Sequence, residues 1–366
     1  VTAGGLLVYV MCLGAYIIPV ALGPTNGLLF AQVVADSATI ALNWPLAGAM
    51  TVIMLVVGTI PLIIVVIVQA LMGLRRSAYP LRNRVASRLL YPFLDVFPTV
   101  IWVGITRTVA LLVLAFLVLP EVVVIIFSFG PIASLTIPPE YVTLDGYAAF
   151  FNDPAWTRPL GRSFVYAGVD ALIALVLGGL AAYGLARSSN KIFMLGLGIL
   201  LFPLILPEIV PALSFYVFAS SFGLTGTSLG IILGQAVTAI GLCAIISATV
   251  IRDVDVNLEH ASRMSGASKF QTLKRVVAPL ALPGLFVGGL YGFLNAFDNL
   301  VLPLFVAEGN QTIPVRMFVS MADSLNSIIA VVAALLILLL LVITGVAVTI
   351  MSRAVTQIDL AKVATR

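Results

Sequence analysis

Long runs of apolar residues, nearly free of charge, constrain the fold of this chain more than any other feature. Several runs extend for about 20 residues, the length that an α-helix needs to cross a hydrocarbon core roughly 30 Å thick. A backbone in lipid finds no water to bond, so it crosses either as helices or as a closed barrel. Barrel strands alternate apolar and polar residues, whereas these runs are apolar throughout. The sequence therefore predicts an all-α, polytopic transmembrane helical bundle.

The composition excludes a soluble globule. Hydrophobic residues make up 61% of the chain and charged residues only 9%, against about 25% charged residues in soluble domains. Too little polar surface is available to cover a water-exposed domain. The apolar runs predict about eight spanning segments, at approximately 1–22, 46–73, 105–129, 162–186, 192–218, 227–251, 281–305 and 327–351.

Basic residues gather on one side of the predicted membrane. If the stretch after residue 73 is cytoplasmic, 16 of the 19 Lys and Arg residues fall in cytoplasmic segments, as expected for a protein of a cytoplasmic membrane. Only Arg158, Arg162 and Arg316 fall outside. The net charge of +4 therefore reflects topology, and no basic and aromatic stripe indicates a nucleic-acid partner.

The residue types that carry chemistry are scarce. Cys12 and Cys243 lie far apart inside apolar runs, and we predict that both are buried small side chains. The single histidine, His260, cannot build a metal cluster alone. No Gly-x4-Gly-Lys-Ser/Thr phosphate loop is present, so the chain does not bind ATP by that route. We predict no catalytic residue, no metal and no cofactor.

An internal repeat divides the chain. Residues 4–19, shifted by 284, fall on 288–303, where Gly-Gly-Leu matches Gly-Gly-Leu and proline matches proline. Each copy continues into a long apolar segment that ends in arginine, at Arg75 and Arg353. The alternative is chance similarity between apolar helices. The repeat predicts the last two helices of a first module at 1–74, a cytoplasmic linker at 75–104, and a second module of six helices at 105–366.

The longest polar insertion on the cytoplasmic side is residues 252–280. Loops of this length are usually functional. Its pattern predicts a first helix near 255–264 that stops at Gly266, and a second helix that Ser268 caps and Pro279 ends. A projecting amphipathic helix pair needs an apolar surface to dock on. The alternative is a helix pair lying on lipid headgroups.

The segment from Glu259 to Pro279 resembles the "EAA" coupling loop of type I ABC importer permeases. That pattern has Glu-Ala-Ala, a glycine shortly after, and a hydrophobic-x-Leu-Pro close. His260 occupies the usual glutamate position, with Glu259 one residue earlier, and Ala278 replaces the usual leucine. Ser262 is a mild variant of the second alanine. The resemblance implies that the loop inserts into a groove of an ATPase subunit. The coupling residues that it implies are Glu259, His260, Ala261, Ser262, Gly266, Ala267, Val276 and Pro279.

Other segments resemble the spermidine/putrescine subfamily. Residues 141–187 and 206–211 are similar to these permeases generally, and 295–299 and 313–318 to the second permease of the polyamine system. Residues 1–74 look like the end of its first permease. The resemblance implies a fused permease pair whose upstream part is absent here. It also implies an ATPase subunit dimer, an extracytoplasmic solute-binding protein and a companion permease module as partners. Polyamine is the implied solute, with ferric iron, phosphonate or another small solute as alternatives.

Acidic residues in or near the spans are candidates for function because charge is costly at that depth. We interpret Glu121 and Asp170 as structural. We expect the acid at the outer end of its span, Asp298, to receive a cationic solute while Phe297 offers a π face. A structural hydrogen bond is the alternative. The candidates for the substrate path are Glu208, Asn295, Phe297 and Asp298.

Two rival functions remain open at the level of sequence. A secondary transporter or channel driven by an ion gradient would need ionisable pairs at the midplane and no cytoplasmic lever. A membrane scaffold would move no solute. The long cytoplasmic loop favours the ATP-driven importer over both rivals.

Overall fold

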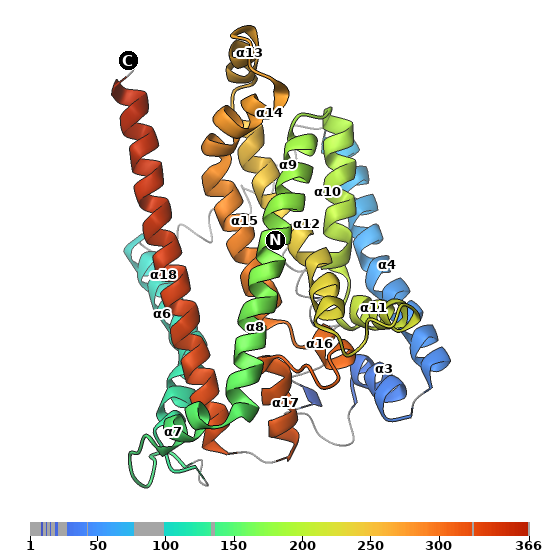
Figure 1. Ribbon diagram of the computed structural model, residues 1–366, viewed down its shortest axis with the longest axis vertical. Coiled ribbons are helices and arrows are strands. Elements are labelled where there is room, and N and C mark those ends of the chain that lie inside the picture. Colours follow the sequence, from blue (N-terminus) through green and yellow to red (C-terminus); the bar gives the residue numbers. More distant parts are fainter. Residues whose placement is uncertain are drawn as a thin grey trace.

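The chain forms an elongated bundle of helices, shown by a computed structural model (Figure 1). The structure describes residues 28–41, 43–76, 99–132, 136–323 and 326–364, together with a few isolated positions before residue 21. These residues form helices, turns and loops but no strand. Among them, six helices are long and apolar enough to cross a membrane, or seven if a bent helix pair counts as one span. The predicted all-α transmembrane fold is confirmed.

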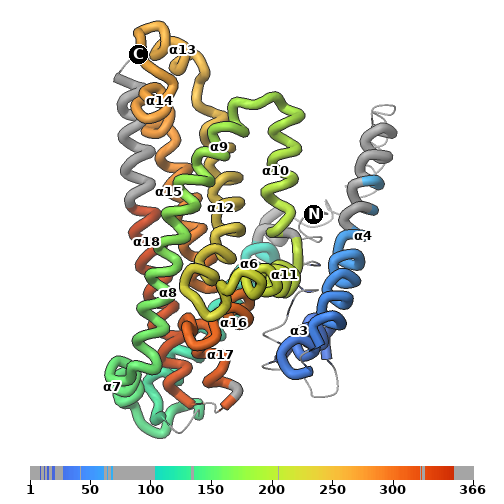
Figure 2. The backbone as a smooth tube through the Cα atoms, turned by 45° about the vertical axis from the view of Figure 1, so that its right-hand side comes forward, coloured from blue at the N-terminus to red at the C-terminus, as the bar shows by residue number. Residues whose placement is uncertain are grey.

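The described helices follow the predicted spans closely. Most of the long helices run along the long axis of the bundle in both views (Figures 1 and 2). In chain order they are α3 (Phe30–Thr39), α4 (Trp44–Arg76), α6 (Thr99–Ser128), α7 (Asp145–Asn152), α8 (Pro154–Ile173), η1 (Ala174–Gly178), α9 (Gly179–Ala186), α10 (Asn190–Ile205), α11 (Ile209–Ser221), α12 (Ser228–Asp253), α13 (Val256–Met264), α14 (Lys269–Thr272), η2 (Leu273–Val277), α15 (Ala278–Asp298), α16 (Val301–Val306), α17 (Ile313–Asp323) and α18 (Ser327–Ala364).

The predicted span 192–218 is two helices rather than one. Helices α10 and α11 meet at an angle of 86°, and α11 runs across the bundle (Figure 2). Leu206, the residue between them that precedes Pro207, has extended backbone angles. A residue before proline is driven out of the helical region by the proline ring. The same break leaves Glu208 at the start of α11.

One helix runs without interruption from the cytoplasmic loop through the membrane. Helices α14, η2 and α15 together form the span Lys269–Asp298. The expectation that Pro279 ends the second loop helix is therefore wrong. The π turn η2 directly precedes α15 and locally changes the hydrogen-bond ladder, so the helix tolerates a residue without an N–H. The loop is consequently the end of a span and not a separate appendage.

Helix α12 forms the centre of the bundle and packs on α15 and on the continuous helix α8–η1–α9. Small residues permit this approach. A Cβ atom added at Gly288 would lie 3.0 Å from the Cα atom of Cys243, and one added at Gly178 would lie 2.9 Å from the Ile240 carbonyl oxygen. Small residues at helix contacts let backbones approach closely in membranes. Glycine at these positions therefore allows three spans to pack as one unit.

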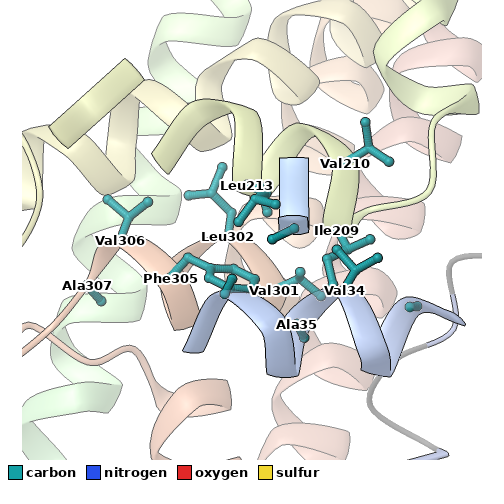
Figure 3. Close-up of a cluster of buried hydrophobic side chains, with 14 of the residues drawn as sticks. Val34, Ala35, Ile209, Val210, Leu213, Val301, Leu302, Phe305, Val306 and Ala307 are labelled. Carbon is teal, nitrogen blue, oxygen red and sulfur yellow. The ribbon is translucent and has the colours of Figure 1, made fainter. Parts of the chain in front are cut away.

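The described helices of the first predicted module pack on the second. Figure 3 shows Val34 and Ala35 of α3 beside Ile209 of α11 and Val301 of α16. Trp44, the first residue of α4, stacks on Tyr216 of α11 with 4.5 Å between ring centroids. This apolar cluster attaches α3 and α4 to the region of the α10–α11 break.

The remaining predictions concern the N-terminal part of the chain and the two cysteines. Most of the predicted span 1–22 and most of the predicted linker 75–104 lie outside the described residues. Cys243 is buried as predicted, but Cys12 is exposed. An apolar run fixes a span but not which of its residues face neighbouring helices, so burial of Cys12 did not follow from its surroundings in the sequence.

Candidate functional site

The loop 252–280 forms the predicted helix pair at one end of the bundle (Figures 1 and 2). Asp255 caps α13, since its carboxylate accepts a hydrogen bond from the Asn257 backbone N–H at 2.9 Å. The helix ends before Gly266, whose φ of +89° favours glycine. Ser268 caps α14 in a reciprocal arrangement with Gln271, with bonds of 2.8 and 3.2 Å. Local capping chemistry thus fixes the shape of the loop.

Most of the predicted coupling residues lie on the surface of this helix pair. His260, Ala261 and Gly266 are exposed, and Ser262 and Ala267 are half-buried. The same surface carries large apolar side chains that the sequence motif did not single out. The exposed fractions are 46% for Leu258, 89% for Met264 and 70% for Phe270. The loop therefore presents an apolar, water-facing surface, which we call the α13–α14 tip.

Val276 and Pro279 do not belong to the tip. Val276 is half-buried in the π turn η2, and Pro279 lies in the first turn of α15. Both positions lie on the span side of Thr272, which is fully buried. These two residues shape the helix that carries the tip toward the membrane.

Glu259 faces the inside of the chain and not the surface. Its exposed fraction is 4%. The Nε–H of Arg187 donates to its Oε1 at 2.7 Å, and the Tyr183 hydroxyl donates to its Oε2 at 2.9 Å. A second nitrogen of Arg187, Nη2, donates to the carbonyl oxygen of Val254 at 3.0 Å. The predicted coupling glutamate is thus held by the end of a membrane span.

Tyr183 and Arg187 are the functional candidates that the sequence did not reveal. Arg187 directly follows α9, and both residues lie in the segment 141–187, whose resemblance to permeases assigns neither of them a role. A cavity of about 360 Å³ lies beside the ion pair, between α9 and α13. Its lining residues are Tyr183, Ala186, Arg187, Ser188, Val256, Glu259, His260 and Arg263. Pairing across more than seventy residues of sequence leaves no local signal, so only the fold reveals it.

The four candidates for the substrate path divide into two groups. Glu208 and Asp298 are exposed and close enough for their charges to repel each other. Neither carboxylate forms an ion pair within the described part of the chain. Asn295 is half-buried one turn before Asp298 on α15. The break after α10 and the end of α15 therefore bring two unpaired acids together, toward the outer side of the bundle.

Phe297 does not present a free π face. Its exposed fraction is 3%, and its ring packs against Phe293 and Phe164, with centroids 5.6 and 5.1 Å away. Phe297 is the neighbour of Asp298 on a helix, so the two side chains point about 100° apart. The expectation that its ring contacts a solute is wrong for this conformation, in which the ring stabilises the helix packing.

The fold and its two polar regions define a membrane permease. Known proteins agree: residues 174–357, half of the chain, match the family described as the binding-protein-dependent transport system inner membrane component. The chain belongs to this family. It is a permease subunit of an ABC importer, a multi-pass protein of the cytoplasmic membrane and not an enzyme. ATP is hydrolysed by a separate ATPase subunit.

Relatives that are named for different solutes are similar to this chain in sequence. The trehalose transport system permease protein SugB of Mycobacterium tuberculosis is 29% identical over 196 residues, which cover 53% of this chain and 72% of that protein. The putrescine transport system permease protein PotI of Escherichia coli is 26% identical over 259 residues, covering 67% of this chain and 90% of that protein.

A solved structure shares the fold. A chain of a bacterial ABC transporter involved in the import of the acidic polysaccharide alginate superposes with a TM-score of 0.52 at 18% identity. The match covers 71% of this chain and 97% of that chain. This chain therefore shares the overall fold of that transporter chain.

Proposed function

We propose that this chain forms the solute pathway of its importer and that residues 255–279 couple the pathway to a dimer of ATPase subunits. The observation that carries the proposal is the α13–α14 tip, which leaves Leu258, Met264 and Phe270 exposed to water. Large apolar side chains left exposed at the end of a bundle indicate an interaction surface. A short amphipathic helix pair fits a groove in a soluble partner. The pair stands beyond the ends of the spans, so a partner in the cytoplasm accounts for it better than lipid headgroups do (Figure 1).

Copurification tests this docking. We expect the tagged chain to retain its ATPase in detergent, and the substitution Phe270→Glu to release it by placing a charge in the apolar contact. Phe222→Glu is the matched control, because Phe222 is similarly exposed, at 67%, but follows α11 away from the tip. An ATPase that stays bound to the Phe270→Glu variant at the parent level would contradict the docking proposal.

We further propose that the chain carries parts of two permease modules, with the boundaries 1–74, 75–104 and 105–366. Two helix pairs support the repeat. A short helix followed by a long apolar helix occurs as α3–α4 and again as α17–α18. Both members start 283 residues apart, at Phe30 and Ile313 and at Trp44 and Ser327. In native membranes, antiserum against residues 252–280 should detect one polypeptide larger than a single permease. A product with residues 105–366 alone would contradict the fusion.

The proposed solute is a small polycation of the spermidine or putrescine type. The two unpaired carboxylates of Glu208 and Asp298 support this choice, because they repel each other until a cation lies between them. PotI, a relative whose name specifies putrescine, is covered over most of its length. SugB, whose name specifies trehalose, keeps an uncharged solute in consideration. Solute would arrive from an extracytoplasmic binding protein at the outer loops near 130–160 and 306–326.

Uptake by the reconstituted complex distinguishes the solutes. Proteoliposomes that hold the permease, its ATPase and its binding protein should accumulate radiolabelled spermidine or putrescine in the presence of ATP. Trehalose, phosphonate and ferric citrate should not compete. Uptake of trehalose with no uptake of either polyamine would contradict the proposed solute but not the importer mechanism.

A secondary transporter finds less support. That mechanism calls for ionisable pairs at the midplane. Asp170 lies near the middle of the span Pro154–Ala186, is fully buried, and has no ionic partner among the described residues. The one ion pair in the described ranges joins Arg187 to Glu259 at the cytoplasmic end.

A further inference from the structure

Two polar contacts connect helix α13 to the membrane-spanning helices. On one side, Glu259 binds Tyr183 and Arg187 at the end of the span α8–η1–α9. On the other side, the hydroxyl groups of Ser262 and Thr272 lie 3.1 Å apart and join α13 to the continuous span Lys269–Asp298. A displacement of α13 can therefore reach two spans directly. The two contacts differ in kind, since only the first contains an ion pair.

Arg187 and Tyr183 together hold Glu259 in place, and we call this group of three residues the clamp. Both oxygen atoms of Glu259 are occupied, one by Arg187 and one by Tyr183. Arg187 also binds the carbonyl oxygen of Val254, in the turn before α13. One side chain thus holds the turn and the helix together. A guanidinium group fixes two acceptors in a set geometry, which a single ammonium cannot do.

We propose that Arg187 and Tyr183 are positioning residues for coupling: they hold Glu259 so that movement of α13 moves the span α8–η1–α9 with it. This inference rests on the proposed docking of the α13–α14 tip to an ATPase, and it assigns the next step after docking. Glu259 then acts within the permease, not on the surface of the partner. The exposed neighbour His260 is left to face the partner.

The span Lys269–Asp298 is long enough to connect the cytoplasmic end with the region of the unpaired acids. Thr272 near one end and Asp298 at the other lie on one helix of 30 residues, about 45 Å long at 1.5 Å per residue. Helix α15 packs on α8 and on η1. Movement of both spans at the cytoplasmic end is therefore transmitted to the region of the unpaired acids. Without the clamp, α13 would lose its contact with the span α8–η1–α9 and keep only its connections to α12 and α14.

The test uses the permease–ATPase complex and does not depend on the identity of the solute. In a background with Cys12→Ala and Cys243→Ala, the reporter Asn295→Cys is labelled with a membrane-impermeant maleimide. Labelling rates are compared without nucleotide and after trapping with ATP and vanadate. We expect the two rates to differ about fivefold or more in the parent, the lower end of typical coupling between sites. Copurification of the ATPase is measured in the same samples.

Four clamp variants are compared with a control. Arg187→Met, Glu259→Gln and the double variant Arg187→Met/Glu259→Met should lose the nucleotide-dependent change while the ATPase still copurifies. Lys191→Met is the matched control, because Lys191 is an exposed cytoplasmic cation at the start of α10, outside the clamp. It should respond like the parent. Tyr183→Phe, which keeps the ion pair, should retain part of the response.

The double variant separates positioning from stability. Removing one member of a buried ion pair leaves an uncompensated charge, whereas removing both does not. If the pair served stability only, the double variant would fold and regain the full response, and that result would overturn the proposal. A parent-like response in either single variant would also overturn it. Loss of the ATPase from the parent complex itself would instead contradict the proposed docking.

Discussion

At the cytoplasmic end of the bundle, the carboxylate of Glu259 is buried and paired with Arg187. Toward the outer side, Glu208 and Asp298 are exposed, and neither pairs with a cation among the described residues. A carboxylate whose oxygens are occupied inside the chain holds helices together and is closed to a ligand. Two carboxylates that only repel each other remain available to a cation. We propose that Glu259 serves transmission and that Glu208 and Asp298 serve binding, and pairing with a cation inside the chain is the feature that separates them.

The largest expected effect falls on the unpaired acids. Asp298→Asn combined with Glu208→Gln should abolish uptake of spermidine, because both charges that would face the solute are removed. Hydrogen bonds to charged groups contribute about 1.5–3 kcal/mol each, so losing two corresponds to a drop in uptake of about a hundredfold or more. Radiolabel uptake into proteoliposomes measures it. Glu121→Gln, at an exposed acid of α6 outside the outer loops, is the matched control. Unchanged spermidine uptake by the double variant would refute the binding role.

At the cytoplasmic end, loss of the ion pair between Arg187 and Glu259 should lower the stability of the permease. Arg187→Met should destabilise the purified permease by about 3 kcal/mol, the cost of stranding a buried carboxylate. Thermal unfolding followed by tryptophan fluorescence in detergent measures the loss. Lys191→Met should leave the unfolding temperature unchanged. If Arg187→Met behaves like the control, the ion pair does not hold α13, and the contrast between the two ends disappears.

The apolar α13–α14 tip should give an intermediate effect on partner binding. Met264→Ala removes the most exposed large apolar side chain of the tip. We expect its affinity for the ATPase to fall about tenfold, equivalent to about 1.4 kcal/mol. Titration of the solubilised permease with labelled ATPase measures the dissociation constant. Met194→Ala, at a methionine exposed at 67% on α10, should have no effect. Equal losses in the two variants would show that the tip is not the contact.

The smallest effect should come from the backbone of the loop. Gly266→Ala meets no neighbouring atom, so its cost is only the strain of φ +89°, about 1 kcal/mol. We expect a few-fold weaker ATPase binding because the turn between α13 and α14 shifts. The control Gly309→Ala also meets no atom and has no positive φ. Tighter binding by Gly266→Ala would mean that the turn is not held in this geometry when the partner is bound.

Much of the fold could be predicted from the sequence because lipid imposes simple requirements on it. Span length and the capping residues Gly266 and Ser268 are local signals, and the structure agrees with them. The predictions that failed concern residues whose effect depends on the conformation of the neighbouring backbone. Pro207 interrupts a predicted span, whereas Pro279 lies inside a helix because a π turn precedes it.

The candidate sites show the same division. The motif identifies the coupling loop, but it does not say that Glu259 faces inward, because its partners Tyr183 and Arg187 lie more than seventy residues away. It also does not say that the ring of Phe297 is enclosed by Phe164 and Phe293. The closeness of Glu208 to Asp298 requires the 86° bend between α10 and α11. Contacts between helices that lie far apart in the sequence can be identified only in the assembled bundle.

Cysteine crosslinking tests the central claim most directly. Ala261→Cys places a thiol on the exposed side of α13, in a background without Cys12 and Cys243. A short bifunctional maleimide should join it to the ATPase subunit and halt ATP-driven uptake, whereas Lys191→Cys should give no crosslink. If Ala261→Cys never reaches the ATPase and spermidine enters proteoliposomes that hold the permease alone, the coupling role of the loop is contradicted.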